Sequence, residues 1–276
     1  MMMPEDTIGS WSMDKLGLLR KYLQAYVTVL KNQSWCKGYE YIDAFAGTGR
    51  PKTRDEQSYV NGSPRIALEL PDPFTKYHFI ETSDWRIKEL EKLRGEFTDR
   101  DIAIYAADCN EILRTTIVPS LPRDSYKRAI AFLDPFGMEL DWITLEEVSR
   151  ATTIEVLLNF PVMAINRNVR LRRKERISPA MRTRMDHFWG TSEWEAELFE
   201  DELTLFGVQS VRIRQSGKEL GLRFQSRVKQ IFPHCTVPVL MTNSKNAPLY
   251  CLIFAGHNQT GVKIANDIFG RFLKMG

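Results

Sequence analysis

Residues 39–49, with the sequence YEYIDAFAGTG, indicate the fold more clearly than any other stretch of the chain. The apolar and aromatic first half is typical of a buried strand, Asp43 closes it, and a glycine turn follows. A second apolar run at 129–133 leads into the sequence DPFG at 134–137. Two buried strands that each deliver a carboxylate to a sharp turn predict a nucleotide-like cofactor beside a reaction site.

The composition is that of a globular protein, with 276 residues, of which 43% are hydrophobic and 26% charged, and a net charge of only +3. No apolar run approaches the roughly 20 residues that a membrane span needs. Residues 1–11 lack the basic-then-apolar pattern of a secretion signal, so we expect a cytoplasmic protein without membrane contact. The cysteines are far apart, with no Cys-x-x-Cys and no pair of histidines near them, so neither a metal site nor a disulfide framework is expected.

Strand-like and helix-like patterns alternate along most of the chain, which predicts right-handed βαβ units. We therefore predict an α/β fold with a Rossmann-like, doubly wound and mostly parallel sheet, an antiparallel edge strand near the C-terminus and a helical insertion. The predicted segments are an N-terminal helix packing on the core (1–35), the cofactor-binding half (36–159), the helical insertion (160–207) and the C-terminal half of the sheet (208–276).

The glycine turn narrows the choice of cofactor. A dinucleotide fingerprint would need a third glycine where Lys52 stands, and a phosphate-binding loop would need Gly-Lys-Ser/Thr, which is absent. Asp43 instead suits a ligand with a positive ammonium group, as S-adenosylmethionine has. We therefore predict S-adenosyl-L-methionine as the cofactor.

Acidic residues at the ends of the next two strands support this cofactor. Glu81 ends the strand after the turn, where a carboxylate can bind ribose hydroxyls. Asp108 follows the third strand and can accept a hydrogen bond from an adenine amino group, although it can also cap the helix that begins after it. The predicted cofactor-binding residues are Asp43, Phe45, Ala46, Gly47, Thr48, Gly49, Glu81, Thr82, Asp108, Cys109 and Asn110.

Residues 134–137 resemble the Asp/Asn-Pro-Pro-aromatic motif of enzymes that methylate exocyclic amino groups. Such an amine is a poor nucleophile because its lone pair is delocalised into the ring. Hydrogen bonds to the Asp134 carboxylate and the Pro135 carbonyl favour a pyramidal nitrogen, and Phe136 can stack on the base. A class I methyltransferase is therefore predicted, with the catalytic residues Asp134, Pro135, Phe136 and Gly137.

The motif departs from its usual pattern, because Phe136 replaces the second proline and Gly137 the aromatic residue. The target atom is therefore open, and so is the alternative that the strand simply ends in a proline-containing turn. Cytosine C5 methylation is not expected, since the chain has no Pro-Cys dipeptide to supply the nucleophile.

The insertion concentrates charge. Between residues 160 and 185 there are eight basic residues and one acid, and residues 186–207 carry seven acids without a Lys or Arg. The basic arm predicts phosphate contacts with DNA or RNA beside the pocket for a flipped or single-stranded base. Alternatively, it pairs with the acids at 193–202 of the same chain. The predicted substrate-binding residues are Arg167, Arg170, Arg172, Arg173, Lys174 and Arg176.

Several stretches together resemble the bacterial three-Cys-motif partner family. The resemblance implies a Rossmann-type, S-adenosylmethionine-dependent methyltransferase-like protein, a possible partner that carries a three-cysteine motif, and a phage-defence context. It also implies that Lys15 and Tyr22 contribute to the cofactor pocket. The residues that carry it are Lys15-Leu16, Tyr22-Leu23, Tyr41–Gly49, Gly62-Ser63-Pro64, Phe79-Ile80-Glu81, Leu133–Gly137, Trp142 and Phe160-Pro161.

The sequence leaves three functions open. The first is a methyltransferase that acts on an exocyclic amino group of a nucleic-acid base. The second is a small-molecule methyltransferase with the insertion as a lid. The third is a non-catalytic subunit that binds S-adenosylmethionine and regulates a partner, which the altered motif at 134–137 favours.

Overall fold

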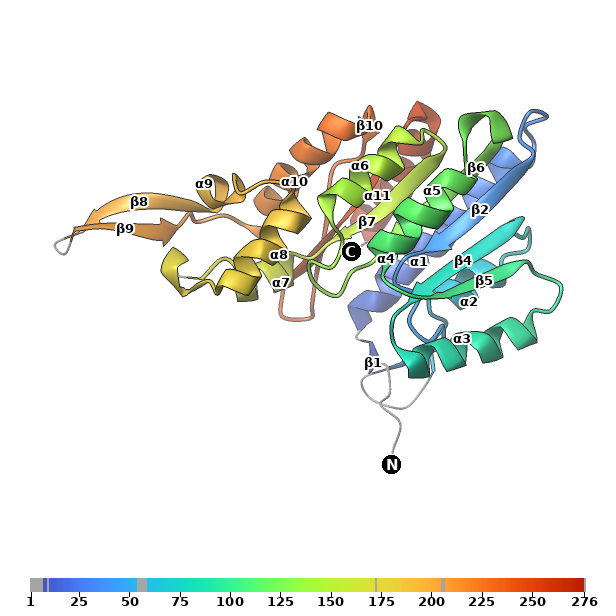
Figure 1. Cartoon of the computed structure of the whole chain (residues 1–276), viewed down its shortest axis with the longest axis horizontal. Coiled ribbons are helices and arrows are strands. Elements are labelled where there is room, and N and C mark those ends of the chain that lie inside the picture. The colour runs from blue at the N-terminus through green and yellow to red at the C-terminus, as the bar shows by residue number, and fades with distance from the viewer. Residues whose placement is uncertain (1–6, 9, 54–58, 172, 205–206, 276) are drawn as a thin grey trace.

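The computed structural model describes residues 7–8, 10–53, 59–171, 173–204 and 207–275. One eight-stranded sheet forms the centre of the molecule, helices cover both of its faces, and the insertion extends from one end (Figure 1). The predicted α/β fold with a mostly parallel sheet is confirmed. No helix in these ranges is both long enough and apolar enough to cross a membrane.

The central sheet is parallel over five neighbouring strands and antiparallel at one side. The antiparallel strand pairs with the last parallel strand, and two short strands pair with its outer edge. In spatial order the strands are β5 (Ile102–Ala106), β4 (Lys76–Glu81), β2 (Gly38–Asp43), β6 (Lys127–Leu133), β7 (Ile154–Phe160) and β12 (Pro248–Gly256), followed by β10 (His234–Cys235) and β11 (Val239–Thr242).

The winding of the sheet reverses between β2 and β6. The chain runs outward from β2 through β4 to β5, and then returns to the other side of β2 to form β6 and β7. Sheets of this kind bind ligands at the reversal, beyond the carboxyl ends of the strands. Asp43 ends β2 and Asp134 directly follows β6, so both carboxylates lie at that position.

The strand register places a third polar side chain at the same edge. Asp43 lies opposite Phe132, so Asp134 stands two residues further along the edge. Leu133 lies opposite Leu158 in the next pair, which brings Asp134 level with Asn159.

Alternation along the strands gives the sheet an apolar core on each face. In β6, for example, Ala131 and Leu133 belong to one core and Ile130 and Phe132 to the other. The first core is covered by α4 (Cys109–Ile112), the π-helical turn η1 (Leu113–Ile117), α5 (Val118–Ser120), α6 (Trp142–Arg150) and α10 (Gly217–Ile231), and the second by α1 (Ser10–Leu30), α2 (Ser63–Leu68), α3 (Asp84–Glu96) and α11 (Gln259–Met275).

Helix α1 lies along the second face from one edge of the sheet to the other. Its leucines and valine at helical spacing are buried, which fixes the helix on the sheet. Near its start Lys15 contacts Asp134 at the carboxyl edge, and two turns later Tyr22 contacts Glu155 near the amino end of β7. Ahead of it, β1 (Thr7–Ile8) pairs in parallel with β3 (Lys52–Thr53).

The insertion after β7 begins with helices and ends in a β-hairpin. Its last helix stops at Leu198, where the carbonyl accepts a hydrogen bond from the Ile213 N–H, and the flanking segments then pair as antiparallel strands that project from the molecule (Figure 1). The elements are α7 (Val162–Asn168), the 3-10 turn η3 (Lys174–Arg176), α8 (Pro179–Trp189), α9 (Trp194–Leu198), β8 (Phe199–Thr204) and β9 (Gly207–Arg212).

Helices α7, α8 and α9 agree with the predicted helical insertion at 160–207, and the hairpin is an addition that was not predicted. The acidic residues 200–202 lie on a strand, because each of them pairs with a residue of β9 rather than continuing α9. The predicted boundary after residue 207 also falls within the hairpin, so the insertion continues to the start of α10. There Ser216 and Glu219 form a capping box.

Candidate cofactor and acceptor site

Asp43 is a fully buried carboxylate at the switch point of the sheet. Its Oδ2 accepts a hydrogen bond from the Tyr41 hydroxyl at 3.0 Å, whereas no described residue donates to its Oδ1. Burial raises the pKa of Asp43 to about 7, even though the Ser63 and Tyr41 hydroxyls act to lower it. A buried acceptor without a donor is costly, so this oxygen is suited to a ligand that brings an N–H or O–H group.

The glycine turn after Asp43 has the backbone that its sequence predicts. Gly47 and Gly49 have φ angles of 62° and 70°, a region that favours glycine. A Cβ on Gly49 would lie 2.8 Å from a methyl carbon of Leu93. Among the other predicted residues here, Phe45 is half-buried, whereas Ala46 and Thr48 are buried.

Glu81 fastens the glycine turn to the end of β4. Its Oε2 accepts the Gly47 N–H at 3.0 Å, and its Oε1 accepts the N–H groups of Thr82 and Ser83 at 2.9 and 3.0 Å. Arg86 Nη1 lies 3.6 Å from Oε2. A carboxylate has about four lone-pair positions, so these three hydrogen bonds leave room for a ligand hydroxyl. Ribose binding by Glu81 stays a prediction.

The side chains of the residues after β5 mostly form hydrogen bonds within the fold. Asp108 caps α4, since its Oδ1 accepts the N–H groups of Asn110 and Glu111 at 2.8 and 3.4 Å. Asp108 is nevertheless exposed, and its Oδ2 accepts no hydrogen bond from the described part of the chain. The capping alternative is thus present, and adenine binding through Oδ2 stays a prediction.

Cys109 and Asn110 are also predicted cofactor contacts, and their side chains have partners within the fold. The Cys109 side chain is buried in the core, and burial raises the pKa of its thiol to about 12. The Asn110 side chain donates to the Glu139 carbonyl at 2.8 Å and accepts from the Asp141 N–H at 2.8 Å and the Thr144 hydroxyl at 2.9 Å. Both side chains are used inside the fold, which leaves only their backbone for a ligand.

Asp134 is held from two sides. Lys15 Nζ donates to Oδ2, and Asn159 Nδ2 donates to Oδ1 at 2.6 Å. Lys15 is only 8% exposed, and its Nζ lies 5.1 Å from the ring centroid of Tyr250 and 5.9 Å from that of Phe132. The two donors fix the carboxylate plane and leave about half of its acceptor capacity unused.

Phe136 presents an open aromatic face beside Asp134. The side chain is 75% exposed, whereas Pro135 before it is buried. The guanidinium carbon of Arg86 lies 5.0 Å from the Phe136 ring centroid, and the same guanidinium reaches Glu81. Arg86 therefore joins the predicted cofactor residues to the predicted acceptor residues. An exposed ring of this kind suits stacking on a base.

The sequence does not predict three residues that contact the site, namely Asn159, Arg86 and Tyr250, and the family resemblance places Tyr22 there wrongly. Asn159 carries a usable signal, as the one polar residue among the last four of β7, whereas Arg86 and Tyr250 carry none. Lys15 was implied by the family resemblance and does reach the site. Tyr22 was implied in the same way, but its hydroxyl donates to Glu155 Oε2 at 3.3 Å, away from the carboxyl edge.

The basic arm is only partly available for a substrate. Arg170 is 4% exposed, and its guanidinium donates to Asn166 and to the carbonyls of Ile213 and Gln215. Burial lowers the pKa of Arg170, and its main role is to hold the insertion together. Lys174 pairs with Glu195 at 3.3 Å, as the alternative of internal pairing predicts.

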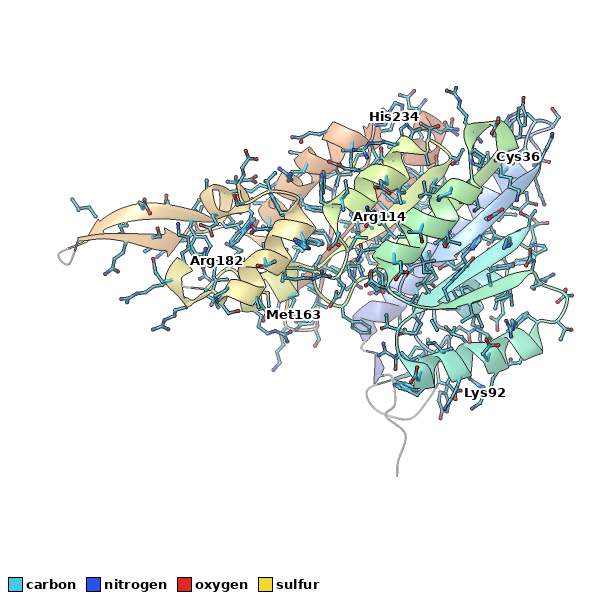
Figure 2. The ribbon with its side chains drawn as sticks, in the orientation of Figure 1. Cys36, Lys92, Arg114, Met163, Arg182 and His234 are labelled. Atoms are coloured by element: carbon cyan, nitrogen blue, oxygen red, sulfur yellow. The ribbon has the colours of Figure 1, made fainter. Side chains whose placement is uncertain are left out.

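Other arginines of the arm face solvent. Arg167, Arg173 and Arg176 are exposed and form no ion pair with any other described residue, while Arg172 lies outside the described residues. An open depression of about 600 Å³ between α7 and the start of α10 adds Arg212 and Arg214. In Figure 2, Met163 and Arg182 mark the insertion, and Cys36 lies at the opposite end of the molecule.

Comparisons with known proteins bear on the fold. No protein-family model and no curated protein matches the chain. A crystal structure of protein LPL1258 from Legionella pneumophila, of family DUF519, is 12% identical and aligns over 94% of this chain and 92% of that one, with a TM-score of 0.54. The chain has a Rossmann-like fold.

Two other solved structures show weaker likenesses, and one of them is a methyltransferase by name. Trm5b from Pyrococcus abyssi is 11% identical over 85% of this chain and 48% of that one, with a TM-score of 0.39. A precorrin-6y C5,15-methyltransferase from Geobacter metallireducens is 12% identical over 86% and 87%, with a TM-score of 0.32. At these values neither likeness carries an argument about function.

Proposed function

We propose that the chain is an S-adenosylmethionine-dependent methyltransferase that acts on an exocyclic amino group of a nucleic-acid base. The proposal rests on one observation: Asp43 and Asp134 stand at the ends of neighbouring strands at the switch point, and the exposed ring of Phe136 lies beside Asp134. One carboxylate is buried with an oxygen that lacks a donor, and the other is fixed by Lys15 and Asn159.

The described residues fit the proposed cofactor. Asp43 Oδ1 would accept a hydrogen bond from its ammonium group, and the turn through Gly47 and Gly49 allows close approach of the backbone. Glu81 has acceptor capacity for ribose hydroxyls, and Asp108 Oδ2 for an adenine amino group. The bound cofactor supplies an electrophilic methyl group on a sulfonium, which keeps the electron pair when the methyl group leaves.

The acceptor side follows from the fixed carboxylate. Asp134 would accept a hydrogen bond from the amino group and the Pro135 carbonyl a second one, so the nitrogen becomes pyramidal and its lone pair is localised on it instead of being delocalised into the ring. The Phe136 ring stacks on the base and orients it. Held in this way, the nitrogen lone pair would face the methyl group that the bound cofactor supplies, and the methylated nitrogen would lose one proton to water. Catalysis rests on alignment and charge placement.

The basic surface supports a nucleic-acid substrate. Helix α7 starts two residues after β7 ends at the carboxyl edge, so the insertion begins next to Asn159. From there Arg167, Arg173 and Arg176 point to solvent, and Arg212 and Arg214 extend the positive charge. Neutralising phosphates with such side chains makes binding strongly salt-dependent.

The decisive experiment follows tritium from labelled S-adenosylmethionine into pooled DNA, RNA and metabolite fractions. We expect label in DNA or RNA, loss of that label in Asp134→Asn, and unchanged labelling in Asp101→Asn, an exposed aspartate at the amino edge. Label in the metabolite fraction would favour the small-molecule alternative. Full labelling by Asp134→Asn would end the proposed role of this carboxylate.

A second candidate is a non-catalytic subunit that binds S-adenosylmethionine. It is favoured by one observation, because both oxygens of Asp134 already accept hydrogen bonds from Lys15 and Asn159. Saturable binding of the cofactor with no labelled fraction would select it. The partner with a three-cysteine motif and the phage-defence context remain predictions from the family resemblance.

A further inference from the structure

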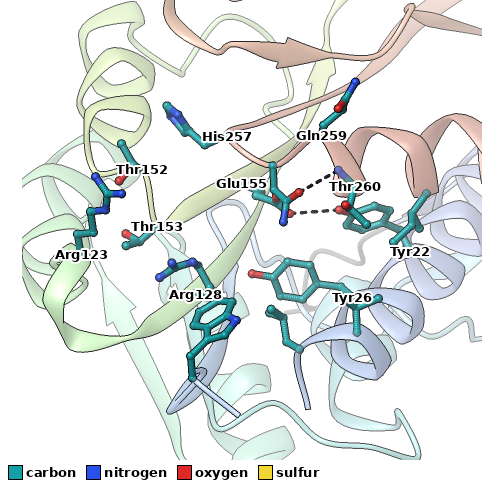
Figure 3. A pocket seen from close by; sticks show the side chains of 16 residues that line it. Tyr22, Tyr26, Arg123, Arg128, Thr152, Thr153, Glu155, His257, Gln259 and Thr260 are labelled. Carbon is teal, nitrogen blue, oxygen red and sulfur yellow. Dashed lines mark hydrogen bonds between the residues drawn. The ribbon is translucent and has the colours of Figure 1, made fainter. Parts of the chain in front are cut away.

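A cavity of about 460 Å³ lies at the amino edge of the sheet, opposite the edge that carries Asp134 (Figure 3). It is enclosed by the second half of α1, by the first residues of β6 and β7, and by the junction between β12 and α11. Its volume falls within the range of about 300–1,000 Å³ that small-molecule sites occupy. Nothing in the proposed methyl transfer uses it.

One wall of the cavity carries a buried hydroxyl without a partner. Tyr26 is 6% exposed and lines the cavity, and its hydroxyl forms no hydrogen bond with any described residue. In Figure 3 the hydroxyl points into the space between Arg128 and Glu155. Buried polar groups almost always have a partner, so this hydroxyl is available to a ligand that enters the cavity.

Two guanidinium groups supply positive charge at one side. Arg128 comes from β6 and Arg123 from the 3-10 turn η2 (Arg123–Ser125). Neither forms an ion pair with a carboxylate in the described ranges. The Arg128 guanidinium lies 4.6 Å from the ring centroid of Trp35 and donates to the Lys127 carbonyl at 2.6 Å, which holds it in place. Fixed, unpaired guanidinium groups bind phosphate or carboxylate.

An acceptor lies beside the hydroxyl. Among the residues that the structure describes, Tyr22 alone donates a hydrogen bond to Glu155, at 3.3 Å. Two glycines make room for it, since a Cβ on Gly256 or on Gly261 would come within 2.9 Å of its side chain. Burial raises the pKa of Glu155 to about 7, and the Tyr22 hydroxyl and the charge of Arg128 act against that rise. Glu155 can therefore accept a hydrogen bond from a ligand.

We propose that this cavity binds a nucleoside monophosphate. The phosphate contacts Arg123 and Arg128, and the base packs against the rings of Tyr22 and Tyr26. A ribose or base N–H or O–H group donates to Glu155, and another group pairs with the Tyr26 hydroxyl. The two arginines lie on one side in Figure 3 and Tyr22 and Thr260 on the other, with Glu155 and Tyr26 between them. A ligand with charge at one end and a ring at the other matches this order.

The test is isothermal titration calorimetry of the full chain with adenosine, guanosine, cytidine and uridine 5′-monophosphates, and with adenosine as the probe without phosphate. We expect one-to-one binding of at least one monophosphate and weaker binding of adenosine. Tyr26→Phe, which removes only the hydroxyl, should weaken binding by about fivefold, and Arg128→Gln by at least about tenfold. Asp134→Asn should leave the affinity unchanged.

Two results would overturn the site. One is the absence of saturable binding of all four monophosphates up to about 1 mM by the folded wild-type chain. The other is binding that Asp43→Asn or Asp134→Asn weakens while Tyr26→Phe does not, which would place the ligand at the carboxyl edge instead. Tyr26→Phe keeps the buried ring and is expected to fold. It therefore tests the site even if Arg128→Gln does not fold.

Discussion

Lys15 and Asp134 form a partly buried contact across 119 residues of sequence, in which the ammonium group of α1 donates to the carboxylate that follows β6. The contact links the first helix to the strand end where we place the reaction. It also sets the orientation of Asp134 together with Asn159, which donates to the other oxygen. A carboxylate held in this way is positioned before any substrate arrives, which lowers the entropic cost of alignment.

Replacing Lys15 with Met should cost stability as well as activity. The variant keeps the apolar stem and removes the charge, so Asp134 loses one of its two donors. We expect the free energy of unfolding to fall by about 2 kcal/mol in urea titrations, because breaking a mostly buried pair leaves a carboxylate without compensation. Lys21→Met, on the exposed side of α1, is the control and should change little. A stable and fully active Lys15→Met would contradict the positioning role.

Cofactor affinity should rise with pH through the pKa of Asp43. With that pKa at about 7, the side chain is mostly neutral at pH 6 and mostly charged at pH 8. Binding of an ammonium group needs the charged form, so affinity should increase about tenfold over this interval. Calorimetry with S-adenosylmethionine at pH 6, 7 and 8 measures it. Asp43→Asn should bind weakly at every pH, and an unchanged pH dependence in that variant would assign the titration to another group.

Glu155 should make the fold less stable as the pH rises. Its pKa is raised from 4.5 to about 7 in the folded chain, so the protonated form is favoured there. The protonated Glu155 side chain contributes stability below pH 4.5. This contribution is lost as the pH rises through 7, and the loss in the free energy of unfolding is about 3 kcal/mol in total. Glu155→Gln removes this loss, so the unfolding free energy of the variant relative to wild type should increase between pH 5 and pH 8. Glu111→Gln, an exposed change, should show no such trend.

Phe136 should matter for the acceptor and not for the fold. Its ring is 75% exposed, so Phe136→Ala should change the unfolding free energy by less than about 0.5 kcal/mol. Loss of stacking costs about 1–3 kcal/mol, so KM for a nucleic-acid substrate should rise at least about fivefold, while S-adenosylmethionine affinity stays the same. Leu203→Ala, which is 81% exposed on the hairpin, serves as the control. Equal KM values for Phe136→Ala and wild type would remove the ring from the acceptor site.

The exposed and the internally paired parts of the basic arm should behave differently. Replacing both Arg173 and Arg176 with Gln should reduce the slope of log affinity against log salt concentration by about 2, since each exposed arginine neutralises about one phosphate. Lys174→Gln should change the slope less, because this lysine is paired with Glu195. Filter binding of a labelled oligonucleotide from 50 to 300 mM salt measures both. Equal effects of the two variants would refute the division of the arm.

Local pattern was enough to predict the architecture. Alternating strands and helices require a doubly wound sheet, and the carboxylates at strand ends then lie on one edge, as Asp43 and Asp134 do. Short-range signals failed where a distant segment decides the structure. The acidic residues 200–202 join a hairpin because β9 pairs with them, and Lys15 reaches Asp134 only because α1 crosses the whole sheet.

The side chains around the cofactor turn show the same limit. Glycine at positions 47 and 49 follows from the tight turn, and the structure gives both a positive φ. Glu81 accepts hydrogen bonds from three backbone N–H groups, and the Asn110 side chain bonds to the backbone of the loop after β6. These contacts depend on how loops from separate strands meet. A residue type and a strand end can suggest a ligand contact, but they do not reveal competing partners inside the fold.

Helix α1 supplies Lys15 at one edge of the sheet and Tyr26 at the other, about 16 Å apart along a single rigid rod. Any axial shift of this rod that displaces one side chain displaces the other by the same amount. A ligand at the amino edge that moved this helix along its axis would also displace Lys15 from Asp134, and thermodynamic reciprocity would then require a ligand at the carboxyl edge to change the affinity of the cavity by the same factor.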